Sequence, residues 1–130
     1  MFNKDGVRKT TYGAPRQILA NVEFQYSVGC IVPKTMGTSV DGKTIVKAGT
    51  PLNIDLTDTL QPVKAAASGS PMNAVLLHDV DVTDADTNAN GTALVFGFIN
   101  LNRVDTTVAG LLTSAKAETG ASPLLTLVKL

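Results

Sequence analysis

The chain has 130 residues, a mass of 13.5 kDa and equal numbers of basic and acidic residues. This length suits one domain with a modest core, and the neutral balance argues against a nucleic-acid binder, which normally carries a basic stripe. Because Cys30 is the single cysteine, an internal disulfide and a cysteine-based zinc site are excluded. Cys30 lies in an apolar run and is expected to be buried.

The first twenty residues follow neither a helical nor a strand period, since Gly6, Gly13 and Pro15 interrupt both. We interpret residues 1–20 as a flexible basic arm and residues 21–130 as a single β-rich domain. The arm is either an idle terminus or a segment that orders on a partner. In the second case the contacts are expected from its bases and scattered apolar or aromatic side chains: Lys4, Arg8, Lys9, Tyr12, Arg16, Ile18 and Leu19.

The arm lacks the apolar stretch of a secretory signal, and the apolar runs of the chain are too short to span a bilayer. We therefore expect a soluble protein made in a reducing cytoplasm, with no membrane partner.

Residues 22–32 alternate between apolar and polar side chains, which predicts a half-buried strand that Pro33 ends. Asp41-Gly42 predicts a hairpin turn that leads into a return strand at residues 44–46. A short strand is expected at residues 52–56. Residues 57–73 are expected to form a loop with one extended piece around Val63.

Residues 74–82 and 92–99 are predicted to form one long hairpin at the centre of the core. The stretches 74–77 and 94–99 are apolar enough to be buried on both faces. This is more than a small domain easily covers, and residues 124–130 add an apolar edge strand, so we expect a homotrimer.

A helix is predicted near residues 105–118. Asp105 is a suitable N-cap, Gly120 is a suitable stop, and four apolar residues recur at helical spacing. They are Val108, Leu111, Leu112 and Ala115. The predicted fold class is mainly β with one short helix, a β-rich α+β domain.

The acidic segment DVDVTDADTNANG, residues 79–91, is the only metal-like feature of the sequence. Its start resembles a calcium loop, but Ala89 replaces the turn glycine and Val95 the bidentate glutamate. A solvated turn is the prediction, and weak ion binding is the alternative.

His78 is the only histidine, and the sequence contains neither a nucleophile elbow nor a phosphate-binding glycine loop. We predict no catalytic, cofactor-binding or metal-binding residues and no enzymatic activity.

Three segments carry a resemblance to a known group. VKAGTPLNIDLTDTLQPVKAA (46–66), AVLLHDVDVT (74–83) and GTALVFGFINLNRVD (91–105) resemble the head-fibre and head-decoration proteins of tailed bacteriophages. In that group a K-A-G-T-P-L turn precedes a strand like G-V-L-L-H-D-V-D-V-T, followed by a variable acidic turn. Asn73-Ala74 departs from the pattern, which has a small residue and Gly there.

The resemblance implies a decoration-protein-like β domain with a mobile N-terminal arm that binds the major capsid protein lattice from outside. The expected location is the virion surface, assembled in the bacterial host cytoplasm, with other copies of the chain as partners, no nucleic acid and no cofactor. The alternative is a binding module for host-surface glycans displayed by the phage. The scarcity of aromatic residues argues against a stacking sugar site.

Overall fold

The structure is a computed structural model that describes residues 17–67 and 69–130. It confirms a mainly β fold with one α-helix. The elements, in chain order, are β2 (Tyr26–Pro33), β3 (Thr38–Val40), β4 (Lys43–Val46), β5 (Pro51–Asn53), β6 (Lys64–Ala65), β7 (Ala74–Leu76), β8 (Val80–Asp81), β9 (Asn88–Asn100), α1 (Thr106–Ala117) and β10 (Leu125–Val128). Short 3₁₀ turns follow β2 and β9. In the described part of the chain, no helix is long and apolar enough to cross a membrane.

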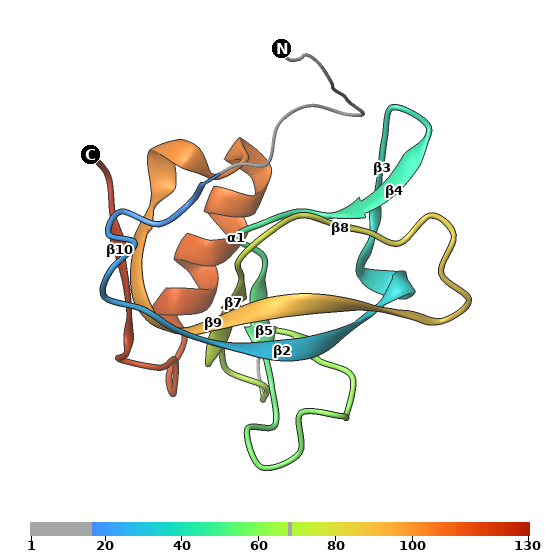
Figure 1. Cartoon of the computed structure of the whole chain (residues 1–130). Helices are drawn as coiled ribbons and strands as arrows, with labels where there is room; N and C mark the ends of the chain where they lie inside the picture. Colours follow the sequence, from blue (N-terminus) through green and yellow to red (C-terminus); the bar gives the residue numbers. More distant parts are fainter. Residues whose placement is uncertain (1–16, 68) are drawn as a thin grey trace.

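Strand β9, with 13 residues, is the centre of the larger sheet. Its N-terminal part pairs with antiparallel β2 and its C-terminal part with parallel β10. Strand β7 pairs with the middle of β9 in antiparallel register, and β5 and β6 continue the sheet beyond β7. The smaller sheet has the order β3-β4-β8. In Figure 1, α1 lies toward the β10 end of the larger sheet and the β3–β4 hairpin toward the opposite end.

The larger sheet is covered on both faces by its own chain. A helix-side core joins Val75 and Leu77 to α1 residues such as Leu112. A second-sheet core joins Ala74, Leu76 and Ala93 of the larger sheet to Val46 and Val80 of the smaller sheet. All three residues of β7 are fully buried, as expected for a strand buried on both faces.

The turn and the helix begin as the sequence predicts. Asp41 and Gly42 both have positive φ, 50° and 80°, which is the requirement of a type I′ hairpin turn between β3 and β4. The Asp105 side chain accepts hydrogen bonds from the Thr107 and Val108 amides and caps α1. However, α1 ends at Ala117, before Gly120, and Leu111 is exposed although its spacing predicted a core position.

The predicted long hairpin is wrong in one respect. β7 does pair with β9, with Val75 opposite Leu94, but β8 leaves this sheet and pairs with β4. The chain changes sheet at His78 and Asp79, after the Leu77 amide has made a last hydrogen bond to β9. As a result, Asn88 to Gly91, expected in the turn, belong to β9 and pair with β2.

Candidate interaction surface

The residues predicted for the arm divide into two groups. Lys4, Arg8, Lys9, Tyr12 and Arg16 lie outside the described residues.

Ile18 and Leu19 instead lie in the helix-side core, 0% and 4% exposed. The Asn100 amide donates to the Ile18 carbonyl at 2.8 Å, and Leu19 forms a bridge with Ile99. The folded body therefore begins before residue 21, and Ile18 and Leu19 are not accessible to a partner. The strand that receives them is 80 residues away, so no local pattern indicates this contact.

The acidic segment uses its carboxylates within the fold. Asp79 accepts a hydrogen bond from the Ala48 amide at 2.7 Å, and Asp81 accepts one from the Thr83 amide at 2.9 Å. Hydrogen bonds from the Thr83 side chain and backbone, together with the nearby Lys43 ammonium, hold the pKa of Asp81 below its ordinary value. Among the described residues, no three His, Cys, Asp or Glu side chains are grouped to hold a metal ion.

Cys30 and His78 are the two other side chains considered as a possible nucleophile or base. Cys30 is buried as predicted, and burial raises the pKa of its thiol, the opposite of what a nucleophilic thiolate needs. His78 is exposed at the point where the chain changes sheet.

The three segments of the phage resemblance meet at one junction. The Lys47 ammonium lies 3.3 Å from the Asp105 carboxylate, and the Gly49 amide donates to the Leu76 carbonyl at 2.7 Å. Gly49 has φ of +94°, and an added Cβ would stand 2.7 Å from a Val104 methyl carbon. The characteristic residues of the resemblance are therefore the residues that join a turn, a central strand and the start of α1.

A surface that we call the aromatic face lies where β2 and β10 flank β9. It consists of Tyr26, Phe96, Phe98 and Leu124, with Phe24 two residues before Tyr26. Tyr26 and Phe96 are register partners across β2 and β9, so their side chains lie on the same face.

Leu124 lies beside this pair, because its carbonyl accepts a hydrogen bond from the Gly97 amide. Leu125 and Ile99 point into the helix-side core, and by alternation Leu124 and Phe98 point away from it.

The alternating sequence pattern predicts that part of the aromatic face is buried. Val22, Phe24 and Tyr26 were expected on the buried side of a strand, yet β2 begins only at Tyr26 and all three are more than half exposed. Further along the same side of β2, Cys30 and Val32 are buried in the second-sheet core. Alternation therefore predicted the side of the strand that faces the core, but not where along the strand the cover ends.

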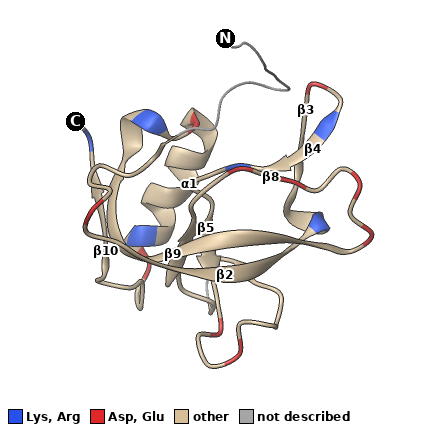
Figure 2. Ribbon diagram, viewed as in Figure 1, with Lys and Arg blue, Asp and Glu red and all other residues tan. Residues whose placement is uncertain are grey.

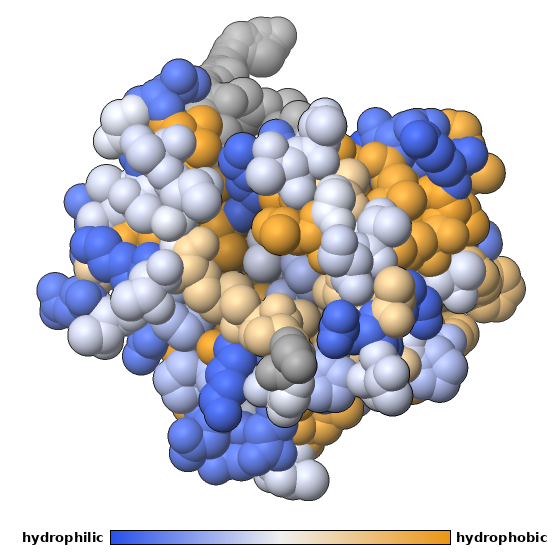
Figure 3. Space-filling model, turned by 180° about the vertical axis from the view of Figure 1, so that it is seen from behind, coloured by the Kyte–Doolittle hydropathy of each residue, from blue (hydrophilic) through white to orange (hydrophobic). Residues whose placement is uncertain are grey.

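The strands that carry the aromatic face are free of charge. β2, β9 and β10 contain no Lys, Arg, Asp or Glu, and Figure 2 shows the charged residues around them and not on them. The view from behind shows hydrophobic side chains in separate areas, the largest toward one edge, with hydrophilic side chains between them (Figure 3).

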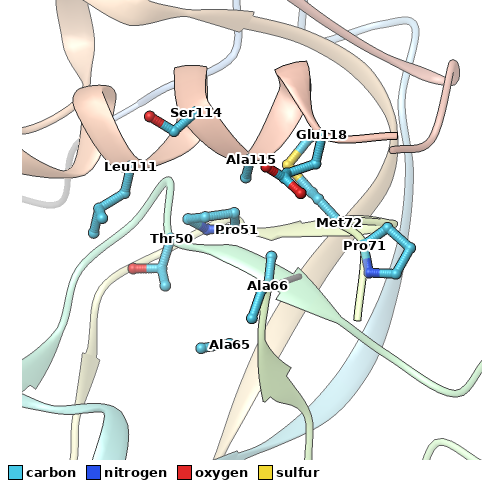
Figure 4. A pocket seen from close by; sticks show the side chains of 11 residues that line it. Thr50, Pro51, Ala65, Ala66, Pro71, Met72, Leu111, Ser114, Ala115 and Glu118 are labelled. Atoms are coloured by element: carbon cyan, nitrogen blue, oxygen red, sulfur yellow. The ribbon is translucent and has the colours of Figure 1, made fainter. Parts of the chain in front are cut away.

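A shallow pocket lies between α1 and the β5–β6 hairpin (Figure 4). Its volume is about 280 Å³, just below the usual range of ligand sites. The walls are mostly small apolar side chains, with Glu118 at the helix end as the charged member. Such a pocket can hold one apolar side chain, but it brings together no set of reactive groups.

Comparison of the chain with protein-family models, curated proteins and solved structures found no match.

Proposed function

We propose that this protein is a structural component of a tailed-phage particle that binds the outer surface of the capsid, decorating and stabilising the head. It acts as a homotrimer on the lattice of the major capsid protein and performs no catalysis.

The observation that carries the proposal is the junction of the three resembling segments. Residues 46–66, 74–83 and 91–105 are separate in sequence, yet Lys47 pairs with Asp105 and Asp79 binds the Ala48 amide. A resemblance that consists of mutually dependent structural residues supports a shared fold. Because these residues hold elements together and present no reactive group, the resemblance favours a structural role.

The reason for expecting a trimer changes with the structure. The strand β7 was thought to need cover from other copies, but α1 and the smaller sheet cover both of its faces within one chain. The exposed apolar surface that another copy could bury is instead the aromatic face, where Phe96 and Phe98 are 39% and 36% exposed.

The basic residues before Gln17 supply the contact with the capsid in this proposal. An extended segment can add to an exposed strand edge of a shell protein, and its bases speed encounter with an acidic rim. Three such segments in one trimer raise avidity by roughly 10²–10⁴ where they bind simultaneously.

The truncated chain that tests the arm has to start at Gln17, because removal of Ile18 and Leu19 opens the helix-side core. A chain of residues 17–130 should keep its melting temperature and its oligomeric mass but lose most of its binding to capsids that lack the protein. If it decorates such capsids as well as the full chain does, the arm is not the contact.

The function itself is tested on particles made by the genome that encodes this chain. Mass spectrometry of gradient-purified heads should find the chain in fixed ratio to the major shell protein. Mild protease treatment of intact heads should remove it before the shell protein is cut. Its absence from purified heads would refute the proposal.

A displayed glycan-binding module is the second candidate, and one observation favours it. The aromatic face offers exposed rings, which can stack on sugars. A glycan array should then give signals that Tyr26→Thr abolishes, whereas a decoration protein gives none.

A further inference from the structure

We propose that the aromatic face, together with the free edge of β2 beside it, is the surface on which a second copy of this chain docks. The inference rests on the self-association in the proposed function and assigns it to one surface.

The aromatic side chains of this face are exposed to solvent. The structure describes Phe24, Tyr26, Phe96 and Phe98, and these side chains are 61%, 61%, 39% and 36% exposed. Their exposed area is on the order of 400 Å² at about 200 Å² per aromatic residue. A standard interface buries about 800 Å² on each partner, so these residues supply about half of one side before Leu124 and the strand edges are included.

The distribution of charge also suits contact between two copies. Aromatic enrichment and loss of charge characterise the centre of an interface. A surface that meets its own copy must also avoid placing like charges opposite each other. The strands β2, β9 and β10 carry no charge, and the whole chain has a net charge of zero, so two copies approach without repulsion.

The outer edge of β2 is open beside the aromatic face. Among residues 17–67 and 69–130, β9 is the only strand that pairs with β2, and only the far end of its outer edge is covered, where the Val63 amide donates to Ile31. From Tyr26 to Cys30 the edge has none of the lysines or prolines that protect exposed edges. The open stretch is the part beside the aromatic face, and a second copy can satisfy its backbone groups.

The test uses the full-length double variant Tyr26→Thr/Phe96→Thr, which removes two facing rings and keeps residues that favour strands. Light scattering without capsids should show wild type as a multimer and the variant with a dissociation constant at least roughly 30-fold higher. The control is Leu60→Thr, a 78% exposed leucine in the loop after β5, which should leave the mass unchanged. Circular dichroism checks that both variants are folded.

A second variant tests the same surface without removing any aromatic side chain, so the inference can still be tested when the first variant does not fold. Thr126→Lys leaves every aromatic residue in place and adds a charge at an exposed β10 position opposite Phe98. It should weaken association in the same way, since the charge would be buried at the contact.

Wild type that is monomeric at all concentrations would overturn the inference, as would variants that keep the wild-type mass. A monomeric wild type whose double variant loses capsid binding assigns the face to the shell, so the inference and the homotrimer fail while capsid binding stands. A multimer that the variants dissociate but that binds no capsid supports the inference and removes the proposed function.

Discussion

The Lys47 ammonium and the Asp105 carboxylate lie 3.3 Å apart and join the turn before β5 to the N-cap of α1. Asp105 has two roles in this position, since its other oxygen accepts hydrogen bonds from the first turn of the helix. Burial works to raise the pKa of Asp105, but the hydrogen bond and charge of Lys47 and the Val108 and Thr107 amides outweigh it and leave the pKa below its ordinary value.

Replacement of Asp105 separates these two roles. Asp105→Ala removes the cap and the ion pair and should cost about 1 kcal/mol, up to about 2, which lowers the melting temperature by roughly 3–6 °C. Asp105→Asn keeps a capping oxygen and loses only the charge, so it should cost a few tenths of a kcal/mol because the pair is partly exposed. Equal losses in the two variants would contradict the capping role.

The lowered pKa of Asp105 predicts how stability depends on pH. A carboxyl with a pKa lower in the folded than in the unfolded state, where it is about 3.9, adds stability that is complete above the unfolded value. That stability disappears as pH falls through the folded value. Urea unfolding should therefore separate wild type from Asp105→Asn at pH 7, and the difference should shrink at pH 3. A difference that stays constant with pH would contradict the assignment.

Gly49 should tolerate no side chain. Its φ of +94° disfavours L-residues, and the added Cβ would meet Val104 at 2.7 Å. Gly49→Ala should cost on the order of 3 kcal/mol through strain and overpacking. Gly42→Ala measures the effect of positive φ alone, because φ is +80° there with nothing within 4 Å, and should cost about 1 kcal/mol. Urea midpoints for the two variants should differ accordingly, and equal losses would show that Val104 does not restrict the site.

Calcium should not stabilise the protein through the acidic segment. The Asp79 and Asp81 carboxylates accept amide hydrogen bonds, whereas Asp84 and Asp86 are exposed on the loop before β9. The melting temperature should be the same with a chelator and with excess calcium at matched ionic strength. A rise of several degrees with calcium would identify a site that this arrangement does not explain.

Local signals predicted the local elements well. Asp41-Gly42 located a hairpin turn and Asp105 a helix start, because both act through backbone geometry within a few residues. Long-range choices were not predictable in the same way. Val80 and Asp81 follow closely on the apolar run of β7, and nothing in their own alternating pattern indicates that they pair with β4 in the other sheet.

The candidate surface was missed for a related reason. Period-two alternation identifies two sides of a strand, but burial of either side depends on what packs there. At Tyr26 the smaller sheet does not extend far enough to cover the apolar side. The burial of Ile18 was equally hidden, since its carbonyl partner is the amide of Asn100.

The central position of β9 has a consequence for synthesis of the chain. Its partners β2 and β7 both precede it, and β2 precedes it by more than fifty residues. During translation, neither β2 nor β7 can pair with β9 until residues 88–100 have left the ribosome. Until then the apolar segments of β2 and β7 lack their main neighbour, and the contacts that complete them close long loops, which slows folding. The larger sheet therefore assembles late, around a strand that is among the last to be made.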